Sequence, residues 1–389
     1  MIRQRAWAAI AAATLLNLPM GSLYAFSVLM KPLEDALGAT RSELSFVFGL
    51  ASVSFTVGMN LAPRVFGLAS APVLVAVCAV VCTAGVALAA TADDVVRLAL
   101  GYGALFGIFG GAAYIFVQQG VHLLVTGHRG LVNGYIVSLY PAGAMIAVPA
   151  FGWALARWDV HVTIAGLAAV VAVTGLAATA LVVHAGVRLP TAAEARSSAP
   201  VARRPAIFWQ LWMVFFLAAA AGLTVLSQAN GIIVAYGGAA PVALIATTAV
   251  TGAIAAARLG GGWLVDRFPI PAVMAAAHVL ALLGTIVLTV WPTPAVSLVT
   301  LAMIGTGYGF ISGATAGAIA FYWSSNDYGR IASRIYIAWC LAAVTLPVLA
   351  GHLYDISGGY RMAVIIAGCG NLLGIGLATL LPRQAKSPG

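Results

Sequence analysis

Charged residues are scarce in this 389-residue chain, at 7% of the sequence, whereas hydrophobic residues make up 62%. A soluble domain carries roughly a quarter charged residues, so this composition excludes an ordinary soluble fold and indicates a membrane protein. Acidic residues are fewer than basic residues, with 10 Asp and Glu against 19 Lys and Arg. None of the acidic residues lies inside an apolar run long enough to cross a bilayer.

Other signals are missing as well. Strand-length alternation is absent, which argues against an outer-membrane barrel. There is no GxxxxGK[ST] loop, so an ATP-driven pump is excluded unless a partner supplies the energy. The 6 histidines are scattered, which argues against a membrane enzyme, and the loops leave no room for the signalling domain of a sensor. The 4 cysteines lie in apolar runs and are interpreted as core residues, with a metal or disulfide role as the alternative. We expect no cofactor.

Apolar runs of about 20 residues recur along the chain, and each is long enough to cross a hydrocarbon core of ~30 Å as a helix. They predict an all-α membrane protein with twelve transmembrane helices, at residues 6–30, 44–62, 70–90, 95–121, 131–155, 160–185, 206–230, 239–265, 271–291, 295–323, 333–354 and 361–382.

One connection is long. Residues 186–205 form a polar linker rich in Arg and Pro, which predicts an N-terminal six-helix bundle (1–185) and a C-terminal six-helix bundle (206–389). The halves resemble each other, since "GYGALFGIFGGAAYIF" in the fourth span matches "GTGYGFISGATAGAIAFY" in the tenth. Two pseudo-symmetric six-span repeats are a transporter architecture, with the substrate site near the midplane between the halves. The alternative is chance similarity among glycine-rich membrane helices.

The basic residues indicate the orientation. With the N-terminus in the cytoplasm, 13 Lys and Arg face the cytoplasm and 5 lie on the far side. The positive-inside rule therefore predicts that both termini and the linker are cytoplasmic. We expect an integral multi-pass protein of a bacterial-type inner (plasma) membrane.

The stretch "GGWLVDRF" (Gly261–Phe268) resembles the loop motif of the major facilitator superfamily between spans 8 and 9. A worn version stands between spans 2 and 3, at Gly58, Pro63, Arg64 and Gly67. The resemblance covers the whole chain and implies the major facilitator fold. It also implies a conformational motif that ties cytoplasmic helix ends together in one state of a two-state carrier. The motif residues are Gly262, Asp266, Arg267 and Arg64.

A narrower resemblance concerns "GSLYAFSVLMKPLEDALGATRSELSFVFGL" (Gly21–Leu50), which is similar to spans 1 and 2 of the monocarboxylate and oxalate/formate branches. Both branches carry an arginine on span 8, eight residues before the loop aspartate, and Arg258 and Asp266 have that spacing. The resemblance implies that Arg258 binds a substrate carboxylate.

The sequence departs from both branches at three places. Animal monocarboxylate carriers have a lysine where this chain has Val28, and an aspartate where it has Ile254. Oxalate exchangers have a lysine on span 11, and residues 336–345 contain none. The resemblance therefore implies organic-anion transport but leaves open anion exchange and proton-coupled symport.

Arg258 also stands out on physical grounds, because no other charge occurs between Ala206 and Leu264. Eight helical residues rise about 12 Å, which places Arg258 near the middle of the bilayer. An arginine at that depth costs roughly 2.5–3.5 kcal/mol, so we expect it to face a water-filled cavity. Its planar fork suits a carboxylate. The alternative is a structural arginine bonded to carbonyls and phenols.

Further polar and aromatic residues lie at suitable depths in spans that line the cavity in this superfamily. For each, the alternative is a packing role or a helix–helix hydrogen bond. His278, on span 9, is interpreted as a packing residue rather than a proton relay. The candidates for substrate binding, besides Arg258, are Tyr24, Tyr114, Gln118, Tyr140, Asn230, Tyr308 and Trp339.

Together these observations predict a secondary active transporter of small organic anions, monocarboxylates in particular, that works by alternating access as a monomer. Its partners would be a small carboxylate anion, a co- or counter-transported proton or anion, and the lipid bilayer, with no nucleic acid. The alternative is a multidrug or amphipathic-solute efflux carrier of the same superfamily.

Overall fold

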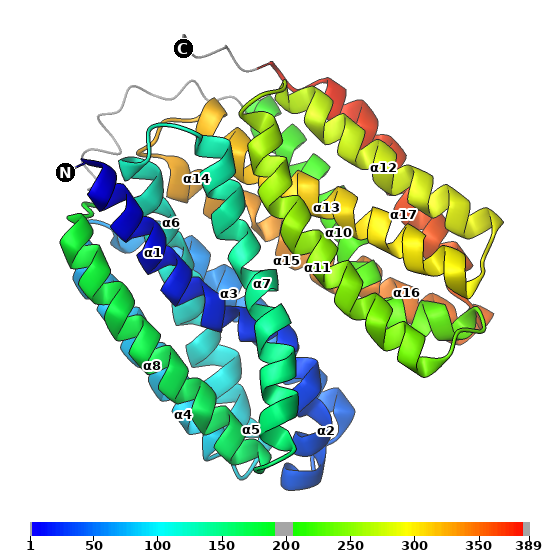
Figure 1. The fold of residues 1–389 in the computed structure, drawn as a ribbon, viewed down its shortest axis with the longest axis horizontal. Coiled ribbons are helices and arrows are strands. Elements are labelled where there is room, and N and C mark those ends of the chain that lie inside the picture. Colours follow the sequence, from blue (N-terminus) through cyan, green and yellow to red (C-terminus); the bar gives the residue numbers. More distant parts are fainter. Residues whose placement is uncertain (1, 191–204, 384–389) are drawn as a thin grey trace. The chain divides into compact units, whose positions relative to one another are not determined.

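The computed structural model describes residues 2–190 and 205–383, which form helices joined by short connections (Figure 1). In this part of the chain, 11 helical stretches are long and apolar enough to cross a membrane. The remaining predicted span, 239–265, is occupied by helix α11 (Ala240–Val265). The predicted all-α fold with twelve spans is therefore confirmed. The predicted linker lies largely outside the described residues, at 191–204.

The first six spans are built from ten helical elements: α1 (Ile2–Met20), the 3-10 segment η1 (Gly21–Ala25), α2 (Phe26–Leu37), α3 (Arg41–Val65), α4 (Ala71–Ala90), α5 (Val95–Leu98), the π-helical segment η2 (Ala99–Phe106), α6 (Gly107–Leu124), α7 (Arg129–Leu155) and α8 (Val160–Ala185). The described part of the second half contains α10 (Pro205–Ala235), α11, α12 (Ile270–Val290), α13 (Pro294–Tyr322), α14 (Tyr328–Ile335), α15 (Ile337–Val344), α16 (Leu346–Ser357) and α17 (Arg361–Thr379).

Two spans are interrupted next to prolines. Pro19 cannot donate a backbone hydrogen bond, and the α-helix gives way to η1 two residues later. Pro347 stands at the start of α16, directly after the break at Thr345. Irregular backbone at membrane depth is tolerated where protein or water covers it. The interruptions place two candidate residues next to irregular backbone, Tyr24 within η1 and Trp339 within the short helix α15.

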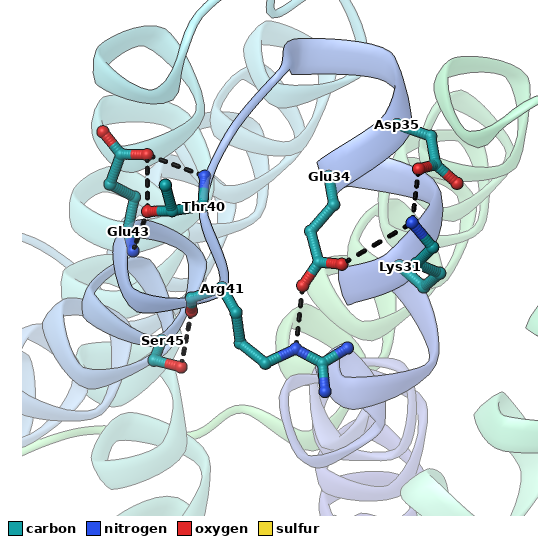
Figure 2. A network of polar contacts seen from close by, with 7 residues as sticks. All are labelled: Lys31, Glu34, Asp35, Thr40, Arg41, Glu43 and Ser45. Atoms are coloured by element: carbon teal, nitrogen blue, oxygen red, sulfur yellow. Dashed lines mark hydrogen bonds and ion pairs between the residues drawn. The ribbon is translucent and has the colours of Figure 1, made fainter.

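The connection between α2 and α3 shows why a span begins where it does (Figure 2). Gly38 ends α2 in the left-handed conformation, at φ +63°. Thr40 and Glu43 then form a capping box at the start of α3: the Thr40 hydroxyl accepts from the backbone N–H of Glu43, and the Glu43 carboxylate accepts from that of Thr40. Arg41 donates to Glu34 across the turn at 2.8 Å. The charges of this network thus lie at the two helix ends that flank the turn.

The described residues fall into two compact units. Unit 1 draws on residues 2–127, 139–190 and 324–334, and in it α4 packs against α8, and α3 against α6. Unit 2 draws on residues 128–138, 205–323 and 335–383, and in it α13 packs against α11 and α12. The helix α7 and the eleventh span are each divided between the units. The domain boundaries 1–185 and 206–389 stay a prediction.

Glycines allow the close packing of α11 on α13. A Cβ atom at Gly313 would lie 1.8 Å from the carbonyl oxygen of Arg258, and one at Gly261 would lie 2.1 Å from that of Phe310. Real Cβ atoms do not approach backbone oxygens so closely. The two helices can therefore keep this separation only while these positions lack a side chain.

Gly313→Ala should destabilise unit 2 because the added methyl group would push α13 away from α11. We expect the free energy of unfolding to fall by roughly 1–3 kcal/mol or more, the range seen when a core is overpacked. The matched control is Gly376→Ala on α17, where a Cβ would meet nothing within 4 Å. Thermal unfolding in detergent measures both, and equal melting temperatures for the two variants would contradict this account of the packing.

Candidate functional site

The side chain of Arg258 is buried, at 6% exposure, and forms hydrogen bonds to neutral groups. One terminal nitrogen donates to the carbonyl oxygen of Val137 and the other to the hydroxyl of Tyr308, both at 2.8 Å. The guanidinium carbon lies 5.3 Å from the centre of the Tyr308 ring, and the indole of Trp339 approaches the same tyrosine. These partners orient the guanidinium but do not neutralise its charge. They also match the structural role that the sequence left as an alternative.

Glycines on two helices bring these partners within reach of Arg258. A Cβ atom at Gly134 on α7 would lie 2.8 Å from the Arg258 carbonyl oxygen, and the approach of Gly313 on α13 is closer still. The Val137 carbonyl follows Gly134 on α7, and Tyr308 precedes Gly313 on α13. Close contact of the backbones thus sets the geometry of the guanidinium.

Three other candidates form an aromatic cluster in unit 1. The ring of Tyr140 lies 5.6 Å from that of Tyr114, 6.3 Å from that of Tyr24 and 5.2 Å from that of Phe55. Tyr140 is 5% exposed, and its hydroxyl has no hydrogen-bond partner among the described residues. Sequence analysis missed Phe55, because a phenylalanine in an apolar span carries no signal that separates a site from a core.

The remaining two candidates are Gln118 and Asn230. Gln118 is fully buried and donates to the hydroxyl of Tyr328 at 3.1 Å. Asn230, on α10, is exposed. Their assignment to substrate binding stays a prediction without support from this geometry.

Asp266 binds the start of α7 through both carboxylate oxygens. One accepts from the backbone N–H of Gly130 and the other from that of Leu131, each at 2.8 Å. The first N–H groups of a helix have no partner within the helix, and its N-terminus carries partial positive charge. The carboxylate satisfies both needs. Gly262 permits the approach, because a Cβ there would lie 2.2 Å from the Gly130 carbonyl oxygen.

The arginines of the predicted conformational motif are exposed. The guanidinium of Arg267 lies 4.0 Å from the ring centre of Trp263. Arg64 donates to the carbonyl oxygen of Asn60 on its own helix at 2.6 Å. In this structure the two hydrogen bonds of the Asp266 carboxylate to a helix start, rather than an Asp–Arg pair, make up the contact at this motif. No group of three or more potential metal ligands occurs among the described residues.

Comparison with known proteins identifies the family. The model of the Major Facilitator Superfamily matches residues 10–344. The chain belongs to this superfamily and is a transporter rather than an enzyme. It is 22% identical over 352 residues to the uncharacterised MFS-type transporter YhjX of Escherichia coli (strain K12), covering 87% of this chain and 86% of that relative. It is 32% identical over 136 residues to Monocarboxylate transporter 13 of Rattus norvegicus, covering 32% and 30% of the two chains.

Solved structures agree on the fold. The proton:xylose symporter XylE bound to 6-bromo-6-deoxy-D-glucose superposes with a TM-score of 0.79 at 14% identity, covering 98% of this chain and 97% of that one. FucP in the outward conformation gives 0.70 at 16% identity, covering 97% and 99%. At these identities the likeness shows the fold and says nothing about the solute.

Asp266→Asn should shift the conformational equilibrium of this transporter and leave its affinity for solute nearly unchanged. The amide keeps one acceptor but loses the charge and the second acceptor, so the hold on α7 should weaken by roughly 1–2 kcal/mol. Transport should then slow. The measurement is the transport rate together with equilibrium solute binding, with the exposed Asp355→Asn as the control. Binding that collapses while the conformational populations stay fixed would reject this interpretation.

Proposed function

We propose that the protein transports small organic anions, monocarboxylates above all, and that Arg258 binds the carboxylate. The observation that carries this proposal is a buried guanidinium whose described partners, the Val137 carbonyl and the Tyr308 hydroxyl, are neutral. Guanidinium offers its N–H donors in a planar fork. A carboxylate accepts two parallel hydrogen bonds from such a fork and balances its charge.

Two further facts support this substrate class. No Asp or Glu lies inside any predicted span, so the sequence offers no carboxylate at the depth of Arg258. The partial match to Monocarboxylate transporter 13 points to the same chemistry. One arginine balances one carboxylate, and a second carboxylate buried without a partner would cost several kcal/mol. We therefore favour monoanions over dianions such as oxalate or malonate.

We also propose the cellular arrangement that the charge pattern predicts. Both termini face the cytoplasm, the protein lies in a bacterial-type inner membrane, and the transporting unit is a monomer that works by alternating access. Tyr24, Tyr114, Tyr140, Tyr308 and Trp339 contribute to solute binding alongside Arg258.

Arg258→Lys should impair uptake of lactate or pyruvate strongly, because lysine keeps the charge but loses the planar fork. Arg258→Ala should abolish anion binding. The matched control is Arg157→Lys, since Arg157 is exposed and its guanidinium lies over the ring of Trp153. Uptake into proteoliposomes from a panel of mono- and dicarboxylates, with an amphipathic cation added, is the measurement. Wild-type uptake by both Arg258 variants, or transport of the cation alone, would sink the proposal and favour an efflux carrier.

Anion exchange should outpace net uptake. The empty carrier holds Arg258 without the anion, and the loaded carrier holds a neutral pair. If closing the cavity without the anion adds even ~3 kcal/mol to the barrier, the empty form reorients roughly a hundredfold more slowly. Preloaded and empty proteoliposomes give the two rates. Net uptake as fast as exchange, driven by an inward proton gradient, would instead establish proton symport.

A further inference from the structure

The helices α7 and α14 begin in the same way. In each, the second residue is a glycine whose backbone N–H donates to a side chain from another helix or loop: Gly130 donates to Asp266 at 2.8 Å, and Gly329 donates to the amide oxygen of Gln119 at 2.6 Å. A Cβ atom at Gly130 would lie 2.7 Å from the Asp266 oxygen, and one at Gly329 would lie 3.0 Å from the Gln119 oxygen. Glycine therefore lets the acceptor close in at both helix starts.

The two acceptors come from different places in their halves. Asp266 belongs to the loop motif after α11, whereas the corresponding loop after α3 carries the worn motif. Placing Gly58 against Gly261 puts Pro63 at the position of Asp266. A proline side chain has no hydrogen-bond acceptor. The first half thus lacks the carboxylate that would bind the start of α14, and Gln119 on α6 occupies that role.

Gln119 binds the start of α14 at two points. Its amide nitrogen donates to the carbonyl oxygen of Ser325 at 2.8 Å, while its amide oxygen accepts from Gly329, and the side chain is fully buried. Next to it, the ring of Tyr328 stacks on His122 with 4.3 Å between centres. Asn60 on α3 donates to the Ser333 carbonyl oxygen at 3.0 Å. These contacts explain why Ser324–Arg334 belongs to the same compact unit as α3 and α6.

The remainder of the eleventh span, from Ile335 onward, belongs to the other unit. The helix α7 is divided in the same manner at Ser138 and Leu139. In both spans, the part bound by a side chain from elsewhere in the chain belongs to a different compact unit from the rest of the span. A transporter that changes conformation must let such a segment change its contacts.

We infer that Gln119 is a positioning residue of the transport cycle, which holds the start of α14 in one conformational state and releases it in the other, as the neutral counterpart of Asp266. One hydrogen bond shifts a conformational equilibrium by roughly two- to tenfold. Two such bonds therefore favour the state in which the start of α14 is held, yet they are weak enough to break in each cycle. This inference concerns the transport cycle of the family and is independent of the solute.

The test follows the exposure of α14. Ser333 lies on this helix and is 2% exposed, so Ser333→Cys introduces a thiol that a small maleimide reaches only when α14 moves away. The background is Cys369→Ser, because Cys369 is the exposed native thiol and the other three are buried. Labelling rates of the purified full-length protein, together with its melting temperature, are the measurements.

Gln119→Met removes both hydrogen bonds at nearly constant volume and should raise the labelling rate by about tenfold or more, with the melting temperature little changed. Gln119→Glu keeps the acceptor for Gly329 but sets a second acceptor against the Ser325 carbonyl oxygen, so its labelling rate should also rise. The matched control is Gln228→Met, because Gln228 accepts one hydrogen bond from the side-chain hydroxyl of Tyr360, at 3.1 Å, and not from a backbone N–H of a helix start. Its labelling rate should equal that of the parent.

Labelling at the parent rate in Gln119→Met would overturn the inference, as would an equal rise in Gln228→Met. If Gln119→Met unfolds, Gln119→Glu decides: a folded protein that labels at the parent rate counts against the positioning role. Asp266→Ala in the same background should also speed labelling, because both holds belong to the same conformational state. A rise there without one in Gln119→Met would show that Asp266 alone sets the equilibrium.

Discussion

Burial of the Arg258 guanidinium is the constraint around which α11 and its neighbours are arranged. A charge at membrane depth must be surrounded by dipoles or water, because hydrocarbon offers nothing to its N–H groups. The chain meets this need with backbone proximity. Gly134 and Gly313 let α7 and α13 approach the backbone of α11, and their neighbours Val137 and Tyr308 supply a carbonyl and a phenol to the guanidinium. The glycine-rich character of these spans is therefore part of the electrostatics of the site.

Backbone groups at the helix ends are satisfied in a similar way. The first N–H groups of α7 and α14 lack partners within their helices, and a side chain from elsewhere satisfies them in each case. Asp266 does so with a charge, which the positive end of α7 stabilises, and Gln119 does so with a neutral amide that also donates. The two helix starts thus share the geometry of this contact but not the type of residue that accepts the hydrogen bond.

Much of the fold could be predicted from the sequence because apolar run length alone locates a membrane helix; α8 and the predicted span share the bounds 160 and 185. The interruptions could not be placed, since a proline marks where a helix can break but not whether neighbouring helices will satisfy the freed backbone. For the site, the lone charge of Arg258 was visible, whereas Phe55 was hidden among apolar residues. Gln118 was predicted to bind the substrate. Its hydrogen bond to Tyr328 could not be foreseen, because the two residues are 210 positions apart in sequence.

Gln119 was overlooked for a related reason, although the sequence held a clue. Pro63 in place of an aspartate means that one helix start must find its acceptor elsewhere, and a buried glutamine is a suitable replacement only when both of its amide groups have partners. A carboxylate at position 119 would face the Ser325 carbonyl oxygen, so that site requires a donor as well as an acceptor. The amide thus fits both contacts at once, which a second aspartate could not. The hold on α14 is therefore made by a neutral amide, while the hold on α7 pairs a carboxylate with the N-terminus of a helix.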